Sequence, residues 1–343
     1  MMAVKVTIVG AGTIGYRVLQ TALLQGDIEV MGITKRNFDD AEGQYLAKNY
    51  GQFIFPVSDL ENKIMGSDVV VDCTDKALHL NMPIYLNYPN LKVIIQGGED
   101  DKQADMFFNS YINYDAAKDA RILQINSCND TNFIRIYHAL SSLPITFGVW
   151  SLCRRSADPK DSKSGPVNAL DAATNTHHAK HVMRTLTNLP LVSNAYKAPV
   201  TEMHAQIPTL ASTAKVSVDD VVAMLSKVPR IVLVSKNRMA DDKKTPYMPT
   251  TAEIREYGRK LNHSGRFGDI YESVIWKDLI SVNEIDPFRD GRKLYLISIP
   301  TAVHQESIVI PDNIDAIRAL SGTMAAQESI AATDRNLSIG KGW

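Results

Sequence analysis

Residues 5–15 read KVTIVGAGTIG, a short run of β-branched residues followed at once by the pattern G-x-G-x-x-G. A helical pattern comes next, with apolar residues from Val18 to Leu24 on one side. In such a strand, turn and helix, the glycines permit a tight turn and the close approach of a pyrophosphate at the helix N-terminus. The order predicts an α/β fold with an N-terminal Rossmann domain, with a glycine-rich turn in an unrelated α/β fold as the alternative. The expected cofactor contacts here are Gly10, Gly12, Thr13, Ile14 and Gly15.

The end of the second expected strand bears on the choice of cofactor. This strand covers residues 28–33 and is followed by Thr34, Lys35 and Arg36. A site for NAD usually has an acidic residue near this point, which binds the ribose hydroxyls. A hydroxyl and two cations can instead contact a 2′-phosphate. We therefore predict that Thr34 and Lys35 bind the cofactor and that NADP is preferred, with NAD also used. A solvated pair of surface cations is the alternative.

Further apolar runs at residues 69–72 and 93–95 have the composition of strands buried in a parallel sheet. Each is followed by polar or glycine residues, and ligands of an open α/β sheet bind beyond the carboxyl ends of its strands. Gly97 follows the second of these runs, so we expect it to contact the cofactor. The next run, residues 121–125, ends shortly before Cys128.

Cys128 is the predicted nucleophile. It stands between the expected strand and a helical pattern that begins with Phe133 and Ile134. Backbone N–H groups and the dipole at the start of a helix stabilise a thiolate, which is the reactive form of cysteine. Such a thiolate is well suited to covalent catalysis. Cys73 also follows a strand, but its neighbours offer no base, so we interpret it as a small buried residue.

Composition limits the class of protein. The chain has 343 residues, 45% of them hydrophobic, which is enough for two globular domains. The formal net charge is -1, so neither nucleic acid nor an anionic membrane surface is expected as the main partner. Three cysteines are too few for a disulfide framework and indicate reduced thiols in the cytoplasm. We expect no signal peptide, no membrane span and no bound metal.

Motifs along nearly the whole chain share the pattern of one family. They are residues 12–15, 34–35, 96–99, 127–129, 154–159, 177–178, 203–204 and 303–319. Through these motifs the chain resembles the archaeal type of glyceraldehyde-3-phosphate dehydrogenase, a phosphorylating enzyme that uses NADP or NAD. The resemblance implies a role in glycolysis or gluconeogenesis, with glyceraldehyde 3-phosphate and inorganic phosphate as substrates.

The resemblance also implies a mechanism. Cys128 would attack the aldehyde, hydride would leave to the nicotinamide, and phosphate would release the resulting thioester as an acyl phosphate. A base beside the thiol is needed to accept protons. The family pattern assigns this role to His204, and His177 and His178 are the alternatives. Each of these histidines could instead be a structural residue or an anion ligand.

Two phosphate groups must be bound during such a reaction. Arg154 and Arg155 suit this task, because a guanidinium group meets phosphate oxygens in a bidentate fork, although a surface ion pair is the alternative. The further phosphate or substrate contacts that we expect are Asn129, Thr131, His177 and His178. We expect Asn313 to contact the nicotinamide amide, with a helix cap as the alternative.

The chain departs from the family next to the nucleophile. The family usually has Cys-Asn-Thr-Thr-Gly, whereas Asp130 and Asn132 stand here in the third and fifth positions. If Asp130 points inward, it would raise the thiol pKa and repel phosphate, and if it caps the following helix it is harmless. Gln206 stands where the family often has a second histidine.

The resemblance implies two domains and a homotetramer. Residues 1–127 and 303–343 would form a discontinuous nucleotide-binding domain, to which a helix from about residue 312 returns. Residues 128–302 would form an α+β catalytic domain with a mainly antiparallel sheet. Its expected strands cover residues 147–153, 199–206, 231–234, 270–275 and 293–299, and its expected helices cover residues 218–226 and 251–261, the first capped by Ser217.

Two other functions remain open on the sequence. An aspartate-semialdehyde dehydrogenase would share the Rossmann domain and the cysteine and histidine chemistry, but Arg154, Arg155 and the histidine pair favour a sugar phosphate. A non-catalytic NADP-binding regulator is favoured only by Asp130. Thiol alkylation separates these classes, because a working Cys128 is expected to react much faster than Cys73 or Cys153.

Overall fold

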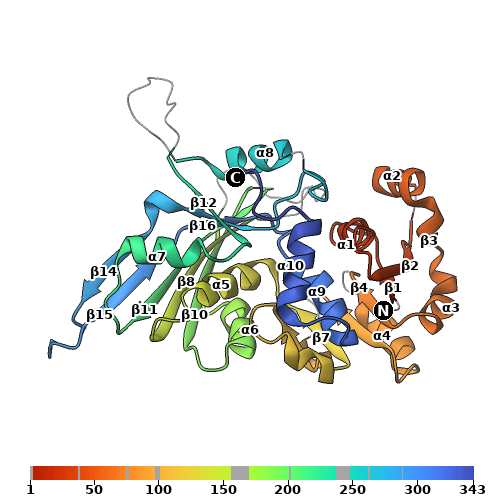
Figure 1. Ribbon diagram of the computed structural model, residues 1–343, viewed down its shortest axis with the longest axis horizontal. Coiled ribbons are helices and arrows are strands. Elements are labelled where there is room, and N and C mark those ends of the chain that lie inside the picture. Colours follow the sequence, from red (N-terminus) through yellow and green to blue (C-terminus); the bar gives the residue numbers. More distant parts are fainter. Residues whose placement is uncertain are drawn as a thin grey trace. The chain divides into compact units, whose positions relative to one another are not determined.

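The computed structural model describes residues 3–37, 39–74, 77–96, 101–155, 170–200, 202–236, 248–261, 263–287 and 289–343 (Figure 1). The chain divides into two compact units. The first comprises Met1–Ser127 and Val309–Ser338, and the second comprises Cys128–Ile308 and Ile339–Trp343. Residues 303–308 and 339–343, which we expected in the nucleotide-binding domain, therefore fold with the second unit. Among the described residues, no helix has both the length and the apolar character needed to cross a membrane.

The first unit is built on a parallel sheet, as predicted. Its strands, within the described ranges, are β1 (Val4–Val9), β2 (Ile28–Thr34), β3 (Ile54–Phe55), β4 (Val69–Asp72), β5 (Lys92–Ile95), β6 (Met106–Phe108) and β7 (Ile122–Ile125). They lie in the order β3-β2-β1-β4-β5-β7-β6, and every pair is parallel. Strands β4 and β7 are buried along their whole length, which explains their continuous apolar sequences. The Rossmann prediction is confirmed.

Helices and short turns complete the first unit. The helices are α1 (Gly15–Ala22), α2 (Ala41–Tyr50), α3 (Leu60–Met65), α4 (Leu78–Leu86), α9 (Ile310–Ser321) and α10 (Ala326–Asn336). The 3₁₀ turns cover Gly51–Phe53, Val57–Asp59, Asp101–Gln103 and Asp115–Asp119. Helices α9 and α10 come from the C-terminal part of the chain, and α9 contacts α1 and strands of the sheet.

Helix α9 is almost completely buried, and polar side chains fix it in place. Asp312 accepts hydrogen bonds from the backbone and hydroxyl of Ser110 at 3.1 and 2.5 Å. Arg318 donates to both carboxylate oxygens of Asp27 at 2.7 Å. The helix begins at Ile310 without a side-chain cap, so the alternative that Asn313 caps this helix is wrong. The side chain of Asn313 points into the unit instead.

The second unit has a mixed sheet. Over the described residues its strands are β8 (Ile145–Arg155), β9 (Asp171–Ala173), β10 (Leu191–Ala198), β11 (His204–Ser212), β12 (Ile231–Val234), β13 (Ser273–Trp276), β14 (Ser281–Ile285), β15 (Leu294–Ser298) and β16 (Thr301–Val303). The order is β12-β13-β16-β11-β8-β10-β9, and β15 joins β11 to β14. Strands β8 and β10, and β12 and β13, pair in parallel, and the other pairs are antiparallel. The sheet is therefore mainly antiparallel, as predicted.

One strand prediction was wrong in its bounds. The strand expected over residues 199–206 begins only at His204 and continues to Ser212. Met203, just before it, has a left-handed backbone with φ of 57°, which is incompatible with an extended strand. The chain therefore turns at Met203 and starts a new strand with His204.

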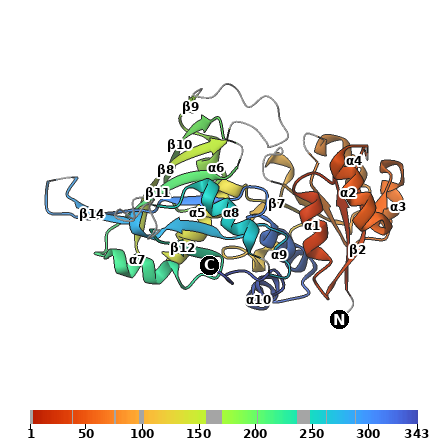
Figure 2. The ribbon, with the colours of Figure 1, turned by 90° about the horizontal axis from the view of Figure 1, so that it is seen from above.

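The helices of the second unit are α5 (Cys128–Ala139), α6 (His177–Thr185), α7 (Val218–Leu225) and α8 (Thr251–Lys260), with a 3₁₀ turn at Lys277–Leu279. The predicted cap of α7 is confirmed, because the Ser217 hydroxyl accepts a hydrogen bond from the backbone of Asp220 and the Asp220 carboxylate accepts one in return. Helix α5 contacts α6, and α6 packs against β10 (Figure 2).

Candidate functional site

The turn after β1 has the shape of a dinucleotide cradle. Gly10 has φ of 90°, and a Cβ atom there would lie 2.9 Å from Thr74. A Cβ atom on Gly15 would lie 1.8 Å from the carbonyl oxygen of Gly10, so only glycine permits this packing. Gly12, by contrast, faces open space within 4 Å of its ideal Cβ position. This combination of a tight turn, an open middle glycine and close helix packing is what a bound pyrophosphate requires.

Carboxylates from later in the chain lie close to the end of β2. Lys35 contacts Asp40 at 2.9 Å and Glu42 at 3.2 Å, whereas Arg36 is exposed. Asp40, which caps α2, and Glu42 in its first turn thus bring two carboxylates to the end of β2. The hydroxyl oxygen of Thr34 is buried and has no hydrogen-bond partner among the described residues, so it is ready to accept a ligand contact.

Asn313 is held in a reciprocal amide pair. Gln96 donates to its Oδ1 atom at 2.9 Å, and its Nδ2 atom donates back to Gln96 at 3.3 Å and to the Val309 carbonyl at 3.0 Å. Both amide protons are thus in use, which leaves Oδ1 as the atom that can take a further contact. Gly97, the other predicted cofactor residue in this region, lies outside the described residues.

The second unit brings Cys128 and His204 together. Cys128 is the first residue of α5, and His204 is the first residue of β11. The Cys128 Sγ atom lies 4.0 Å from the Nδ1 atom of His204. His204 is buried and Cys128 is partly buried, and the contact brings the predicted nucleophile and the predicted base side by side. Of the three histidines considered from the sequence, His204 is the one with a contact to Cys128 in the described structure.

The electrostatics of this pair differ from the prediction. Burial raises the pKa of the Cys128 thiol to about 12, and the carboxylates of Asp130 and Glu306 add to the effect, whereas Arg155 opposes it. Burial also lowers the pKa of His204 to about 3, with Arg155 and Arg154 acting in the same direction. The free protein therefore holds a neutral thiol beside a neutral imidazole. Burial thus opposes the thiolate that the helix N-terminus was expected to stabilise.

Side-chain amides surround His204. Its Nδ1 atom lies 2.8 Å from Asn129 Oδ1, which also accepts a hydrogen bond from Gln206 at 2.7 Å. The Oε1 atom of Gln206 accepts from Trp150 and from Asn132, each at 3.0 Å. Sequence reasoning did not include Gln206 or Trp150 in the site. The signal that could have found Gln206 was its spacing from His204, which places both side chains on the same buried face of β11.

Asp130 points inward and contacts histidines of α6. It is completely buried, and its Oδ1 atom lies 3.1 Å from His178 Nδ1, while its Oδ2 atom lies 3.8 Å from His181 Nδ1. His178 Nε2 in turn lies 3.5 Å from the amide nitrogen of Asn129. His177 is exposed and stacks beside His178, and burial together with its charged neighbours lowers the pKa of His177 to about 4.

The two predicted arginines differ in their surroundings. Arg155 contacts Glu306 at 2.5 Å, and Glu306 contacts His304 at 3.2 Å. The Nε atom of Arg154 is buried and has no hydrogen-bond partner within the described part of the chain. Thr131 is completely buried on α5, so it offers no exposed surface to a phosphate. Arg154 is thus the arginine with an unsatisfied donor, which an anion would satisfy.

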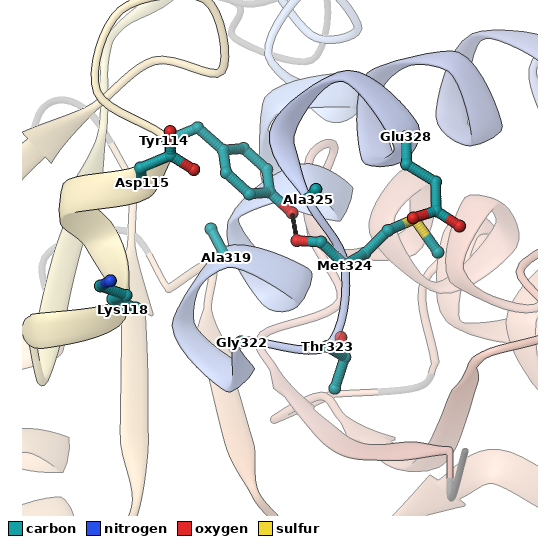
Figure 3. A pocket seen from close by; sticks show the side chains of 9 residues that line it. All are labelled: Tyr114, Asp115, Lys118, Ala319, Gly322, Thr323, Met324, Ala325 and Glu328. Atoms are coloured by element: carbon teal, nitrogen blue, oxygen red, sulfur yellow. Dashed lines mark hydrogen bonds between the residues drawn. The ribbon is translucent and has the colours of Figure 1, made fainter.

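A pocket in the first unit involves none of these residues. It has a volume of about 300 Å³ and is lined by Tyr114, Asp115, Lys118, Ala319, Gly322, Thr323, Met324, Ala325 and Glu328 (Figure 3). Within it, the Tyr114 hydroxyl donates to the Met324 carbonyl at 3.1 Å. None of the residues predicted to bind cofactor or substrate lines this pocket.

Comparison with known proteins matches both parts of this arrangement. Residues 1–81 match the family model described as shikimate / quinate 5-dehydrogenase. The glyceraldehyde-3-phosphate dehydrogenase of Archaeoglobus fulgidus is 35% identical over 99% of this chain and 99% of its own length. The proteins of that name from Sulfolobus acidocaldarius and Sulfurisphaera tokodaii are 35% and 36% identical, over 100% of this chain and 99% of their own lengths.

Proposed function

Because the chain belongs to the glyceraldehyde-3-phosphate dehydrogenase family, we propose that it converts D-glyceraldehyde 3-phosphate, phosphate and NADP⁺ to 1,3-bisphosphoglycerate and NADPH, in glycolysis or gluconeogenesis. Family membership makes it an oxidoreductase that uses NAD(P). The observation that carries the more specific proposal is the contact of 4.0 Å between Cys128 and His204 at the start of α5. A thiol beside an imidazole is the equipment for oxidation through a covalent thioester.

The proposed reaction has three steps. The Cys128 sulfur forms a bond to the aldehyde carbon, and the thiol proton passes to the aldehyde oxygen, which gives a hemithioacetal. The carbon then gives up a hydride, and His204 accepts the hydroxyl proton, which leaves a thioester on Cys128. A phosphate oxygen finally attacks the thioester carbon, the carbon–sulfur bond breaks to release the acyl phosphate, and the Cys128 sulfur leaves with the electron pair and regains a proton as His204 loses the one that it accepted. A nicotinamide cofactor, when bound, is the acceptor of the hydride.

The neutral Cys128 and His204 pair is compatible with this sequence. The first step moves a proton from sulfur to oxygen and leaves no net charge on the protein. A pKa of about 12 for Cys128 therefore does not block addition to the aldehyde. A pKa of about 3 for His204 keeps the imidazole neutral near pH 7, so that it is free to accept the hydroxyl proton in the second step.

We assign the anion contact first to Arg154. Its buried Nε atom lacks a partner among the described residues, and an unsatisfied buried donor is destabilising until a ligand occupies it. Arg155 is already paired with Glu306 and lowers the pKa of Cys128, so its main effect would be on the thiol. His177 is exposed beside His178 and can assist in binding a phosphate.

NADP is the cofactor that we propose as preferred. The open position at Gly12 fits a pyrophosphate, and the unpaired hydroxyl of Thr34 ends β2 where the ribose is expected. Arg36 is exposed and can contact a 2′-phosphate, whereas Lys35 is partly neutralised by Asp40 and Glu42. The preference therefore depends more on Arg36 than on Lys35.

Self-association is part of the proposal. The face of β8, β10 and β11 that lies opposite His204 and Gln206 exposes apolar side chains, namely Val149, Val192, Tyr196 and Ile207. Such a face favours packing against another copy of the same sheet, consistent with a homotetramer. The cytoplasm is the compartment that we propose, since Cys73, Cys128 and Cys153 are all free thiols.

The test is NADP⁺ reduction by the purified protein with glyceraldehyde 3-phosphate, with and without inorganic phosphate. Turnover that depends on phosphate and is lost in Cys128→Ser is the expected result. Turnover without phosphate would overturn the acyl-phosphate step. Absence of turnover in a protein that still binds NADP would overturn the assigned substrate, and aspartate semialdehyde would then be tested in its place.

A further inference from the structure

The hydrogen bonds around His204 form a chain whose direction can be read from its ends. At one end stands Trp150, whose indole nitrogen can only donate a hydrogen bond. It lies 3.0 Å from one amide atom of Gln206, which must therefore be the oxygen. The amide nitrogen of Gln206 then faces Asn129 at 2.7 Å and donates to it. The Asn129 atom that receives this bond is in consequence the oxygen, Oδ1.

The contacts at the other end of the chain are compatible with the same direction. Asp130 is completely buried, and an ionised carboxylate can only accept hydrogen bonds. His178 must therefore carry a proton on Nδ1, which lies 3.1 Å from Asp130. Its Nε2 atom faces Asn129 at 3.5 Å, on the side where the direction set by Trp150 places the Asn129 amide NH₂. Both ends of the chain are thus compatible with Oδ1 toward His204.

His204 has one compatible protonation state in this setting. Its Nδ1 atom lies 2.8 Å from Asn129 Oδ1, which offers lone pairs only. Nδ1 must carry the proton, and Nε2 must carry the lone pair. The same Nδ1 atom is the one that lies 4.0 Å from the Cys128 sulfur. An N–H group cannot accept the thiol proton, so this contact is not a route for deprotonating Cys128.

We propose that Trp150, Gln206, Asn129, His178 and Asp130 act together as positioning residues that fix His204 as the Nδ1–H tautomer, so that its Nε2 atom is the base for the substrate hydroxyl. This inference rests on the proposed function, because the hydroxyl meant is that of the hemithioacetal in the proposed reaction. It gives a purpose to Asp130, since this carboxylate anchors one end of the chain. In this tautomer Nδ1 does not accept the thiol proton of Cys128, so the lone pair of His204 remains available for the substrate hydroxyl.

The direct test is the tautomer itself. Protein labelled with ¹⁵N-histidine would be studied by long-range ¹H–¹⁵N correlation at neutral pH, with His204→Asn to identify the signal among the eight histidines. The expected pattern is a proton on Nδ1 of His204. A proton on Nε2 would overturn the proposal whatever the kinetics show, and this measurement needs no variant in the network.

Variants at the two ends of the hydrogen-bond chain, next to Trp150 and at Asp130, test whether this chain fixes the tautomer of His204. Gln206→Met breaks the connection to Trp150, and Asp130→Leu removes the acceptor that fixes His178. Either change alone leaves one anchor, so the Nδ1–H pattern is expected to persist. The double variant loses both anchors, and a mixture of tautomers with a lower kcat is expected. An unchanged pure Nδ1–H pattern in a folded double variant would overturn the proposal.

A matched control is Asn132→Ala. Asn132 donates to the same Gln206 oxygen as Trp150 does, but its loss leaves the indole to set the direction. The Nδ1–H pattern is therefore expected to remain, and a mixture of tautomers in this variant would contradict the role of Trp150 as an anchor. Phosphate-dependent turnover is measured in parallel. If the wild-type protein shows Nδ1–H but no turnover, the proposed function is wrong and the tautomer proposal stands. If it shows turnover but Nε2–H, the tautomer proposal is wrong and the proposed function stands.

Discussion

Replacing Asp130 with asparagine should make Cys128 more acidic and therefore more reactive. The rise in the thiol pKa from 9.0 to about 12 corresponds to about 4 kcal/mol against the thiolate. Burial is the largest cause, and the Asp130 carboxylate is the next. Asparagine has nearly the same shape as aspartate, so Asp130→Asn removes the charge while the burial stays.

The size of the effect follows from Coulomb's law. With an effective dielectric constant of about 20, a unit charge on the order of 8 Å from a thiolate would contribute about 2 kcal/mol, or between one and two pKa units. The thiolate fraction at a fixed pH below the pKa changes in proportion. We therefore expect alkylation of Cys128 to be about ten times faster or more in Asp130→Asn between pH 7 and 9.

The assay has to isolate one thiol. Cys153 is exposed and can also be alkylated, so the measurement uses a Cys153→Ser background. Burial raises the pKa of Cys73 well above its usual value, so this thiol contributes little. Asp219→Asn removes an exposed carboxylate from α7 and serves as the control. Equal alkylation rates in Asp130→Asn and in the control, with both proteins folded, would refute the electrostatic reasoning.

Three further predictions concern the arginines, the histidine and the cofactor. Arg154→Met should raise the KM for phosphate or for the sugar phosphate by about tenfold to a hundredfold, as expected for the loss of a charged hydrogen bond of about 1.5–3 kcal/mol, without slowing alkylation. Arg155→Met should instead slow alkylation, because Arg155 lowers the pKa of Cys128. Slower alkylation in Arg154→Met together with a raised KM in Arg155→Met would contradict this division of roles between the two arginines. His204 has a folded pKa of about 3, below the unfolded value near 6.5, so its contribution to stability is present above pH 6.5 and is lost as the pH falls through about 3. The loss approaches about 5 kcal/mol, and urea unfolding of His204→Asn should show a flatter dependence on pH over this range. Arg36→Ala should weaken NADP binding by about tenfold and leave NAD binding unchanged, as measured by titration calorimetry, and equal losses for both cofactors would contradict the 2′-phosphate contact.

The first unit could be predicted from the sequence because its signals are local. The pattern of glycines at 10, 12 and 15 is local in the sequence, and the structure shows a steric demand at Gly10 and Gly15 and open space at Gly12. The cap of α7 is equally local, since Ser217 and Asp220 lie within one turn. No local motif marks the left-handed turn at Met203, and the predicted start of strand β11 was therefore wrong.

The site could be predicted only in part, since its properties depend on residues far apart in the chain. The meeting of Cys128 with His204 was expected from the resemblance, although their charge states were not. The helix N-terminus is visible in the sequence, whereas the burial that exceeds its effect is a property of the folded unit. Likewise, nothing beside Arg155 in the sequence indicates its partner Glu306, which lies 151 positions away.

The raised thiol pKa and the fixed tautomer of His204 are two parts of one arrangement. A permanent thiolate would place a charge in a site where burial and the carboxylates of Asp130 and Glu306 together oppose it by about 4 kcal/mol. A neutral thiol avoids this penalty and adds to an aldehyde without net separation of charge. The hydride step is different, because the hydroxyl proton has to leave as the carbon loses its hydride. That step requires a neutral base with its lone pair free, and the amide chain from Trp150 to Asp130 keeps the lone pair of His204 on Nε2, away from Cys128. The base is thus reserved for the one step that cannot proceed without it.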